Sequence, residues 1–68
     1  GYAMNALRGY QVIDRDGGYV VSSTYNVVDD ITGKILKQNK KSSFYAIDEE
    51  LKEHIEAIKK YIEERLEG

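Results

Sequence analysis

Apolar residues in the last third of the chain recur with the period of an α-helix. Five of them follow one another at intervals of four, three, four and four positions: Leu51, Ile55, Ile58, Ile62 and Leu66. Such spacing places all five side chains along one face of a helix. Asp48 is suited to cap the helix N-terminus, and Glu49 and Glu50 bring negative charge to the first turn, where the helix dipole favours it. The pattern predicts an amphipathic helix over residues 48–67.

Shorter runs rich in Val, Ile, Tyr and Thr, separated by turn residues, precede this helix and predict β-strands. A first strand is expected over residues 10–14 and a second over 19–29. The segments between and after them, 14–18 and 30–33, contain glycines that can adopt positive φ in tight turns. A third strand opens at Lys34. Residues 39–43 either continue it or bulge outward, and residues 44–47 either finish it or form a fourth strand.

Turns this short join antiparallel neighbours, so the predicted fold class is α+β. The expected architecture is an antiparallel three-stranded (or four-stranded) meander over residues 10–47, followed by one C-terminal amphipathic helix packed on one sheet face (βββα). The more apolar side of the second strand should meet the helix if no bulge intervenes at residues 22–23. Its members are Tyr19, Val21, Ser23, Tyr25 and Val27.

The length of 68 residues predicts a single domain over residues 1–68 with a thin hydrophobic core. Small domains often gain stability from disulfides, metals or oligomerisation. The chain has no Cys and one His, so self-association is the expected route. No apolar run reaches membrane-spanning length and no signal peptide is recognisable, which indicates a cytoplasmic protein. Residues 1–3 precede Met4 and are interpreted as a non-native remnant, with Met4 as the native start.

Catalytic chemistry finds little support among the polar residues. His54 has no Ser or Cys partner at a recognisable spacing and is expected to be a boundary residue half-covered by a strand. Residues 14–18 resemble the start of a calcium loop, but Tyr25 stands where such a loop needs a Glu. The glycines match no phosphate-binding motif. We therefore expect no enzyme activity, no metal, no cofactor and no small-molecule substrate.

Charge is distributed unevenly between the two parts of the chain. Residues 1–47 carry a net charge of +2 and residues 48–68 a net charge of −4. Four lysines lie near the third strand, at positions 34, 37, 40 and 41. They either contact phosphates or prevent the edge of the sheet from pairing with another strand. Strict alternation would place Lys37 and Lys41 opposite to Lys34 and Lys40. The acidic helix face is either solvated or a docking surface for a basic partner. The candidate partner-binding residues are Tyr25, Lys34, Lys37, Lys40, Lys41, Tyr45 and Tyr61.

Two functional hypotheses follow from these features. The first is a small non-catalytic protein-interaction module of the kind found in bacteria or phages, a modulator or inhibitor of a larger protein that also forms a homodimer. The dimer could use the edge strand 34–47, the first strand, or the helix stripe widened by His54 and Tyr61. The alternative is a DNA-binding module. Its strand–strand–strand–helix order is similar to that of the small N-terminal domains of some tyrosine recombinases, which implies a sheet laid on DNA with Lys34–Lys41 facing phosphates.

Overall fold

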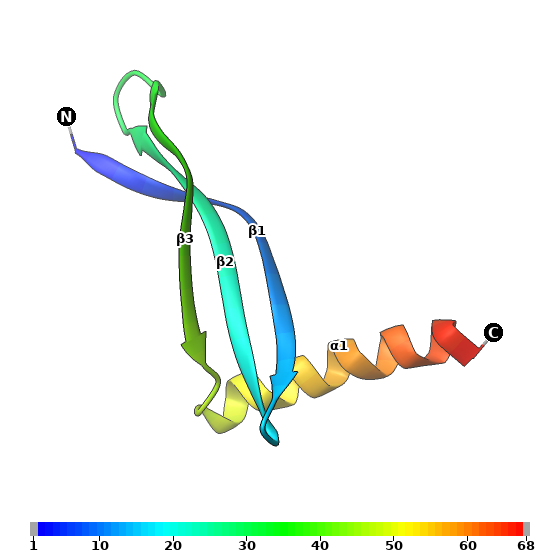
Figure 1. Cartoon of the computed structure of the whole chain (residues 1–68). Helices are drawn as coiled ribbons and strands as arrows, with labels where there is room; N and C mark the ends of the chain where they lie inside the picture. The colour runs from blue at the N-terminus through cyan, green and yellow to red at the C-terminus, as the bar shows by residue number, and fades with distance from the viewer. Residues whose placement is uncertain (1, 68) are drawn as a thin grey trace.

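Three antiparallel strands form one sheet in chain order, and a single helix follows them (Figure 1). The computed structural model describes residues 2–67. The elements are β1 (Ala3–Arg15), β2 (Gly18–Asp29), β3 (Ile35–Tyr45) and α1 (Glu49–Glu67). The predicted βββα fold is confirmed. The sheet has three strands, because residues 39–45 continue β3 and form no fourth strand.

The β1–β2 hairpin closes through a two-residue turn, Asp16-Gly17. Both residues have positive φ, 51° at Asp16 and 81° at Gly17, and Arg15 pairs with Gly18 directly before and after them. A turn with two positive φ values matches the right-handed twist of the flanking strands, and Asp-Gly is a preferred sequence for it. The predicted turn over residues 14–18 is therefore confirmed.

Asp29 organises the connection between β2 and β3. Its Oδ1 accepts hydrogen bonds from the backbone N–H of Ile31 at 2.9 Å and of Thr32 at 3.0 Å. Gly33 completes the turn with φ of 74° and donates its N–H to the Asp29 carbonyl at 2.9 Å. The hydrogen bonds from Thr32 and then Ile31 hold the pKa of the Asp29 carboxyl below its usual range. Asp29 therefore starts the turn, which lies where the sequence predicted one, over residues 30–33.

The first strand is longer than predicted. We expected it to begin at Tyr10, but β1 begins at Ala3 and pairs with β2 along its whole length. A register shift at Arg8 leaves one extra residue in β1 between the pairs Leu7–Tyr25 and Gly9–Thr24. Residues 3–7 lack β-branched side chains, so their own sequence does not predict a strand. They adopt the extended conformation because they pair with β2. Ala3 thus takes part in the sheet, whereas Gly1 and Gly68 lie outside the described residues.

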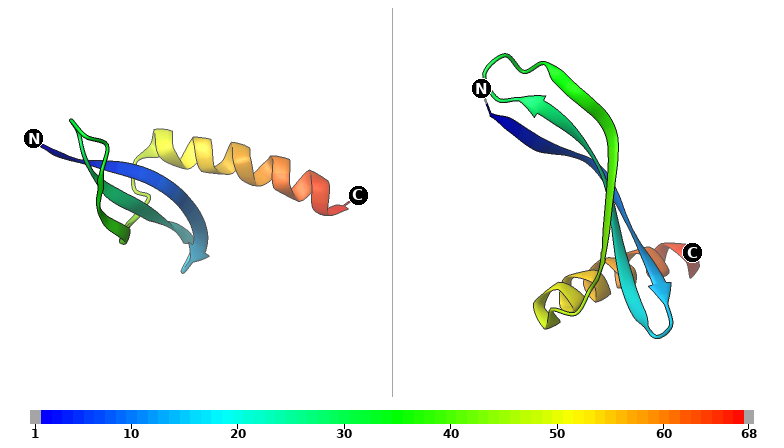
Figure 2. Two further views of the ribbon diagram at one scale, coloured as in Figure 1. Left: turned by 90° about the horizontal axis from the view of Figure 1, so that it is seen from above. Right: turned by 60° about the vertical axis from the view of Figure 1, so that its left-hand side comes forward.

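The helix lies across one end of the sheet and leaves the other end uncovered (Figure 2). Asp48 caps it as predicted, because its Oδ1 accepts a hydrogen bond from the Glu50 N–H at 3.1 Å. Among the described residues, the buried hydrophobic side chains are Ala46 and Ile55, only 5% and 6% exposed. The molecule is elongated, with extents of 46 × 28 × 18 Å. The predicted packing of the helix on one sheet face is thus confined to one end of that face.

Candidate interaction surfaces

The helix is seated on the sheet through Ile55 and a polar cluster beside it. The Tyr19 hydroxyl of β2 donates a hydrogen bond to Oε1 of Glu56. Lys59 Nζ lies 5.6 Å from the centre of the Tyr19 ring and 3.6 Å from Oδ2 of Asp14. These contacts confirm that the Tyr19 side of β2 meets the helix. We call Asp14, Tyr19, Ile55, Glu56 and Lys59 the helix seat.

Two side chains of the helix seat have shifted pKa values. The hydrogen bond to the Glu56 carboxylate raises the pKa of the Tyr19 hydroxyl above its ordinary value, because it favours the protonated donor. The pKa of Lys59 is also raised, mainly by its hydrogen bond with Tyr19 and then by the negative charge of Asp14. Both shifts extend the protonated forms of Tyr19 and Lys59 to higher pH than usual.

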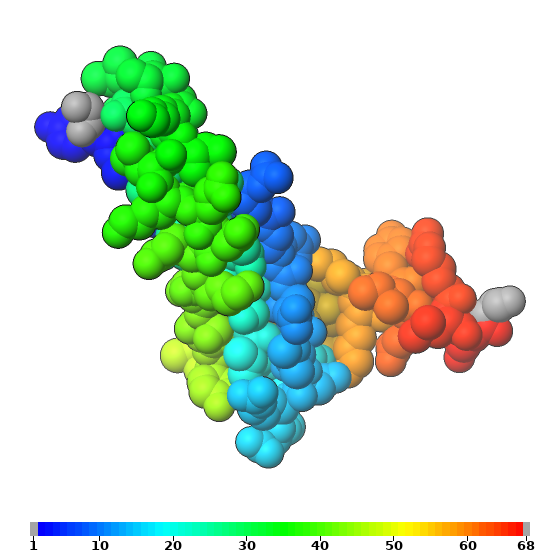
Figure 3. Space-filling view, turned by 45° about the horizontal axis from the view of Figure 1, so that its top comes forward, coloured from blue at the N-terminus to red at the C-terminus, as the bar shows by residue number. Residues whose placement is uncertain are grey.

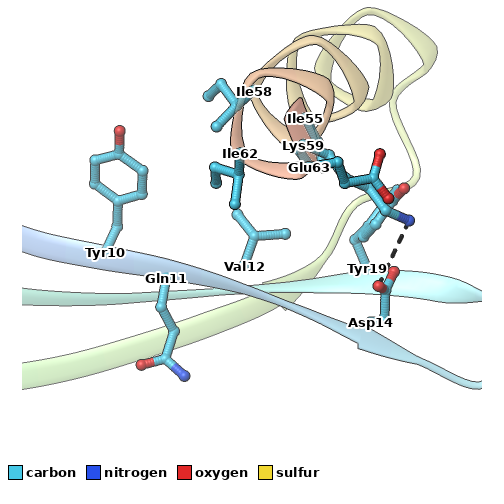
Figure 4. Close-up of a pocket in the computed structure, with 10 residues that line it drawn as sticks. All are labelled: Tyr10, Gln11, Val12, Asp14, Tyr19, Ile55, Ile58, Lys59, Ile62 and Glu63. Atoms are coloured by element: carbon cyan, nitrogen blue, oxygen red, sulfur yellow. Dashed lines mark ion pairs between the residues drawn. The ribbon is translucent and has the colours of Figure 1, made fainter. Parts of the chain in front are cut away.

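An apolar groove of about 340 Å³ runs between the helix and β1. Figure 4 shows Tyr10 and Val12 rising from β1 toward Ile58 and Ile62 of the helix, whereas Gln11 points away from it. Ile58 and Ile62 are still 50% and 53% exposed, so the groove is open to solvent. Its apolar walls are suited to receive further apolar side chains, but nothing within residues 2–67 fills it.

The helix extends past β1 at the side of the sheet. Figures 1 and 3 show its C-terminal part projecting beyond the edge strand, and we call residues 60–67 the overhang. Exposure along the apolar stripe rises from 6% at Ile55 to 79% at Leu66. Tyr61, one of the predicted partner-binding residues, lies on the overhang and is 66% exposed. Ile62, near the start of the overhang, still lines the groove over β1, whereas Leu66 does not, so the amphipathic pattern continues past the groove.

The far end of the same sheet face carries a second, shallower hollow. Leu7 and Tyr25 stand opposite each other on β1 and β2, and residues directly opposite in a sheet share a face. With Asn5, Ser23 and Ser42 they line a hollow of about 300 Å³. Leu7 is 63% exposed. The predicted residue Tyr25 therefore has an apolar neighbour that the sequence did not single out.

The lysines near β3 are arranged differently from the predicted alternation. Lys37 pairs with Val27 and Lys40 with Tyr25, which places these two on the same side of the sheet, whereas Lys41 pairs with Thr24 on the other side. The predicted grouping of Lys37 with Lys41 is therefore wrong. The first of two register shifts between β2 and β3, between the pairs Tyr25–Lys40 and Val27–Lys37, causes this, because an extra residue in β3 reverses the faces of the residues beyond it. Asn39, with φ of 57°, lies at the first shift.

The other candidate residues lie apart from Lys37 and Lys40. Lys34 precedes β3 in the connection from β2, and Lys41 Nζ is 3.4 Å from the Thr24 hydroxyl. Tyr45 pairs with Val20 near the helix end of the sheet and lines a separate hollow with Ala46 and Lys52. The seven candidate residues therefore form no single patch.

His54 is not half-covered, contrary to the sequence expectation. Its side chain is 71% exposed and its Nε2 lies 3.8 Å from Oε1 of Glu50, one helical turn earlier. His54 lies beside the apolar stripe and not on it. The helix meets the sheet through the face that carries Ile55, so no strand covers His54. Within residues 2–67 no polar side chain is buried, and no three acidic or His side chains gather as a metal site.

Sequence reasoning missed the apolar residues of β1 that border the two hollows. Leu7, Tyr10 and Val12 share the helix side of the sheet, but the bulge at Arg8 interrupts their alternation. A search for apolar positions two apart, with one residue inserted, would have joined them into one stripe. That stripe and the helix stripe together form an apolar surface on the helix side of the sheet.

No helix in the described part of the chain combines the length and apolar character that crossing a bilayer requires. Comparisons of the chain with protein-family models, with curated proteins and with solved structures give no match. The function has to be inferred from the surfaces described above.

Proposed function

We propose that this chain is a small, non-catalytic protein-interaction module that works as a self-associated unit. Its accessible surface supports this proposal most directly. The single chain exposes 5777 Å², whereas a folded monomer of its mass exposes about 4,400 Å² by the usual scaling. The difference, about 1,400 Å², is comparable with what each partner of a stable dimer buries, which is about 800 Å² or more.

The distribution of mass supports the same proposal. The radius of gyration is 15.5 Å, whereas a compact domain of this length has about 11 Å. The two buried hydrophobic side chains, Ala46 and Ile55, cannot supply the core that a stable domain needs. A partner that covers the apolar stripes of α1 and β1 would supply it.

The chemistry of the exposed groups favours binding over catalysis. The groove between α1 and β1 is open and apolar, and the titratable groups of the helix seat are bound to one another, with the Tyr19 hydroxyl donating a hydrogen bond to Glu56. A catalytic acid or base would need a cleft with a perturbed group free to meet a substrate. The described residues offer an apolar surface for a macromolecule instead.

DNA binding is the weaker candidate. A sheet laid on DNA needs its cations on one face, but Lys40 and Lys41 stand on opposite sides of β3. The face with Lys37 and Lys40 also carries the acidic helix at its other end, which would repel phosphates. No observation favours this function over protein binding.

Sedimentation equilibrium of the full chain tests the proposal directly. We expect a concentration-dependent mass that reaches at least the dimer, with a folded circular dichroism spectrum throughout. A strict monomer that stays folded from micromolar to millimolar concentration would contradict self-association. A titration with a mixed-sequence DNA duplex in the same buffer, expected to leave the NMR spectrum unchanged, would reveal the alternative function.

A further inference from the structure

The two edges of the sheet differ in the features that prevent strand pairing. Proteins guard exposed edges with lysines, bulges or prolines. β3 carries Lys37, Lys40 and Lys41 and two register shifts. In β1, residues 3–13 include a single charged side chain, Arg8, and a single register shift, which lies at the same residue. Within the described chain no strand lies on the outer side of β1. The β1 edge is therefore open to another strand, whereas the β3 edge is guarded.

The helix overhang points to the same side. It projects past β1, and not past β3, as Figures 1 and 3 show. Ile55 and Leu66 are 11 residues apart, which is close to three full turns, so Leu66 faces the sheet plane as Ile55 does. The exposed end of the stripe therefore faces the space that a strand added to β1 would occupy.

We propose that two copies of this chain pair antiparallel through their β1 edges, and that the overhang of each copy packs on the sheet of the other. This inference rests on the proposed function, because it specifies the surface through which the chain self-associates. A two-fold axis perpendicular to the sheet makes the two β1 strands antiparallel and keeps both helices on one face. The two three-stranded sheets then become one continuous sheet.

The lengths in this arrangement agree. Ile62 and Glu63 still line the groove over the chain's own β1, and the four helix residues after them add about 6 Å at 1.5 Å per residue, enough to reach about one further strand spaced 4.8 Å away. Because β1 pairs antiparallel with its copy, the helix end of one β1 lies beside the N-terminal half of the other. The strand reached is then β1 of the second copy at Leu7, which lines the hollow of about 300 Å³ together with Tyr25.

The occupant is a second copy because each copy offers what the other lacks. Every protomer has an exposed apolar side chain, Leu66, at the end of its helix, and a sheet region without a helix above it in which Leu7 and Tyr25 are the large side chains. A two-fold axis joins these complementary surfaces twice and closes the assembly, so no edge of β1 remains free. The unpaired surface of about 1,400 Å² per chain is of the size that such an interface buries.

A matched pair of double variants tests the edge assignment. Ala6→Lys with Gln11→Lys places two lysines on β1, and Gln38→Lys with Ser43→Lys places two on β3 at the same spacing. Like charges opposite each other destabilise strand pairing, so we expect the β1 variant to weaken dimerisation about tenfold or more. The β3 variant should dimerise like the parent chain. Sedimentation equilibrium gives the dimer dissociation constant of each variant, and circular dichroism reports whether each variant folds.

Two further measurements keep the inference testable if the β1 variant does not fold. Leu66→Gln alters a side chain that is 79% exposed in one chain, and we expect it to weaken the dimer while Glu64→Gln does not. Hydrogen exchange of the parent chain at high concentration should protect more amides in β1 than in β3.

The outcomes separate this inference from the proposed function. A dimer that resists the β1 variant, or protection of β3 in place of β1, would overturn the edge assignment and leave self-association standing. A chain that stays monomeric at all concentrations would remove both.

Discussion

The two halves of α1 carry the same amphipathic pattern but have different surroundings. Ile55, over the sheet, is 6% exposed, whereas Leu66, eleven residues further along the same stripe, is 79% exposed. The same spacing predicted both on the apolar helix face that packs on the sheet. The comparison shows that an apolar stripe indicates which surface must be covered, but not whether its own chain covers it. The overhang is thus the part of the helix whose partner has to come from outside.

The largest effect should follow from changing the buried end of the stripe. Ile55→Ala removes apolar atoms from one of the two buried positions and leaves a gap, which we expect to cost about 2–4 kcal/mol. Ile62→Ala, on a side chain 53% exposed, should cost much less when the chain is monomeric. Urea unfolding at low concentration measures both. Equal losses would show that the two halves of α1 are packed alike.

If Ile55→Ala does not fold, Ile55→Val serves in its place with an expected loss of about 1 kcal/mol. The matching change at the exposed end is Ile62→Val. If the overhang packs on a second copy, raising the protein concentration should increase the loss of stability caused by the Ile62 variants. The loss caused by the Ile55 variant should stay unchanged.

The cap at the start of the seated half should give the next largest effect. Asp48→Ala removes the acceptor of the Glu50 N–H and should destabilise the chain by about 1 kcal/mol. Asp48→Asn keeps an acceptor oxygen and should retain most of the stability. Urea midpoints compare the three proteins. If Ala and Asn variants are equally stable, the side chain does not cap the helix.

The helix seat should also make stability depend on alkaline pH. Because the pKa of Tyr19 is raised in the folded chain, the folded state holds the phenolic proton more tightly than the unfolded state. The resulting stabilisation is complete below the ordinary tyrosine pKa and is lost as the pH rises through the folded value. The raised pKa of Lys59 acts in the same direction.

Tyr19→Phe removes this proton and should flatten the alkaline decline of the thermal midpoint. Tyr61→Phe, on the overhang, is the matched control and should leave the decline unchanged. Ultraviolet titration should show one tyrosine with a late transition only when Tyr19 is present. A late tyrosine that survives Tyr19→Phe would assign the shift to another residue.

The smallest effect should come from the ion pair at the rim of the seat. Asp14 and Lys59 are 3.6 Å apart, with side chains 70% and 39% exposed, and exposed pairs contribute little to stability. Asp14→Asn should therefore shift the urea midpoint hardly at all, and NMR shifts should change around Lys59 alone. A clear loss of stability would mean that this pair, and not Ile55, holds the helix on the sheet.

Local signals determined much of the fold. The Asp16-Gly17 turn was predictable because few residue pairs adopt two positive φ values, and the Asp29 turn because its carboxylate can bind the following N–H groups. The antiparallel order of the strands followed from these short connections, whereas the structure decided that there are three strands and not four. The candidate site was predicted less well, because the bulges at Arg8 and Asn39 changed which side chains share a face. A register shift depends on both strands, so one strand's sequence does not indicate it.

The sequence alone determined the helix, because its period, the Asp48 cap and the apolar stripe are properties of neighbouring residues. It also determined that the surface would be rich in apolar groups too numerous for one small core. Only the tertiary structure decided that residues 3–7 form a strand, since they gain their hydrogen bonds from β2 and not from β propensity. It likewise decided that α1 crosses one end of the sheet and passes β1, because the short link from Tyr45 to Glu49 fixes where the helix begins.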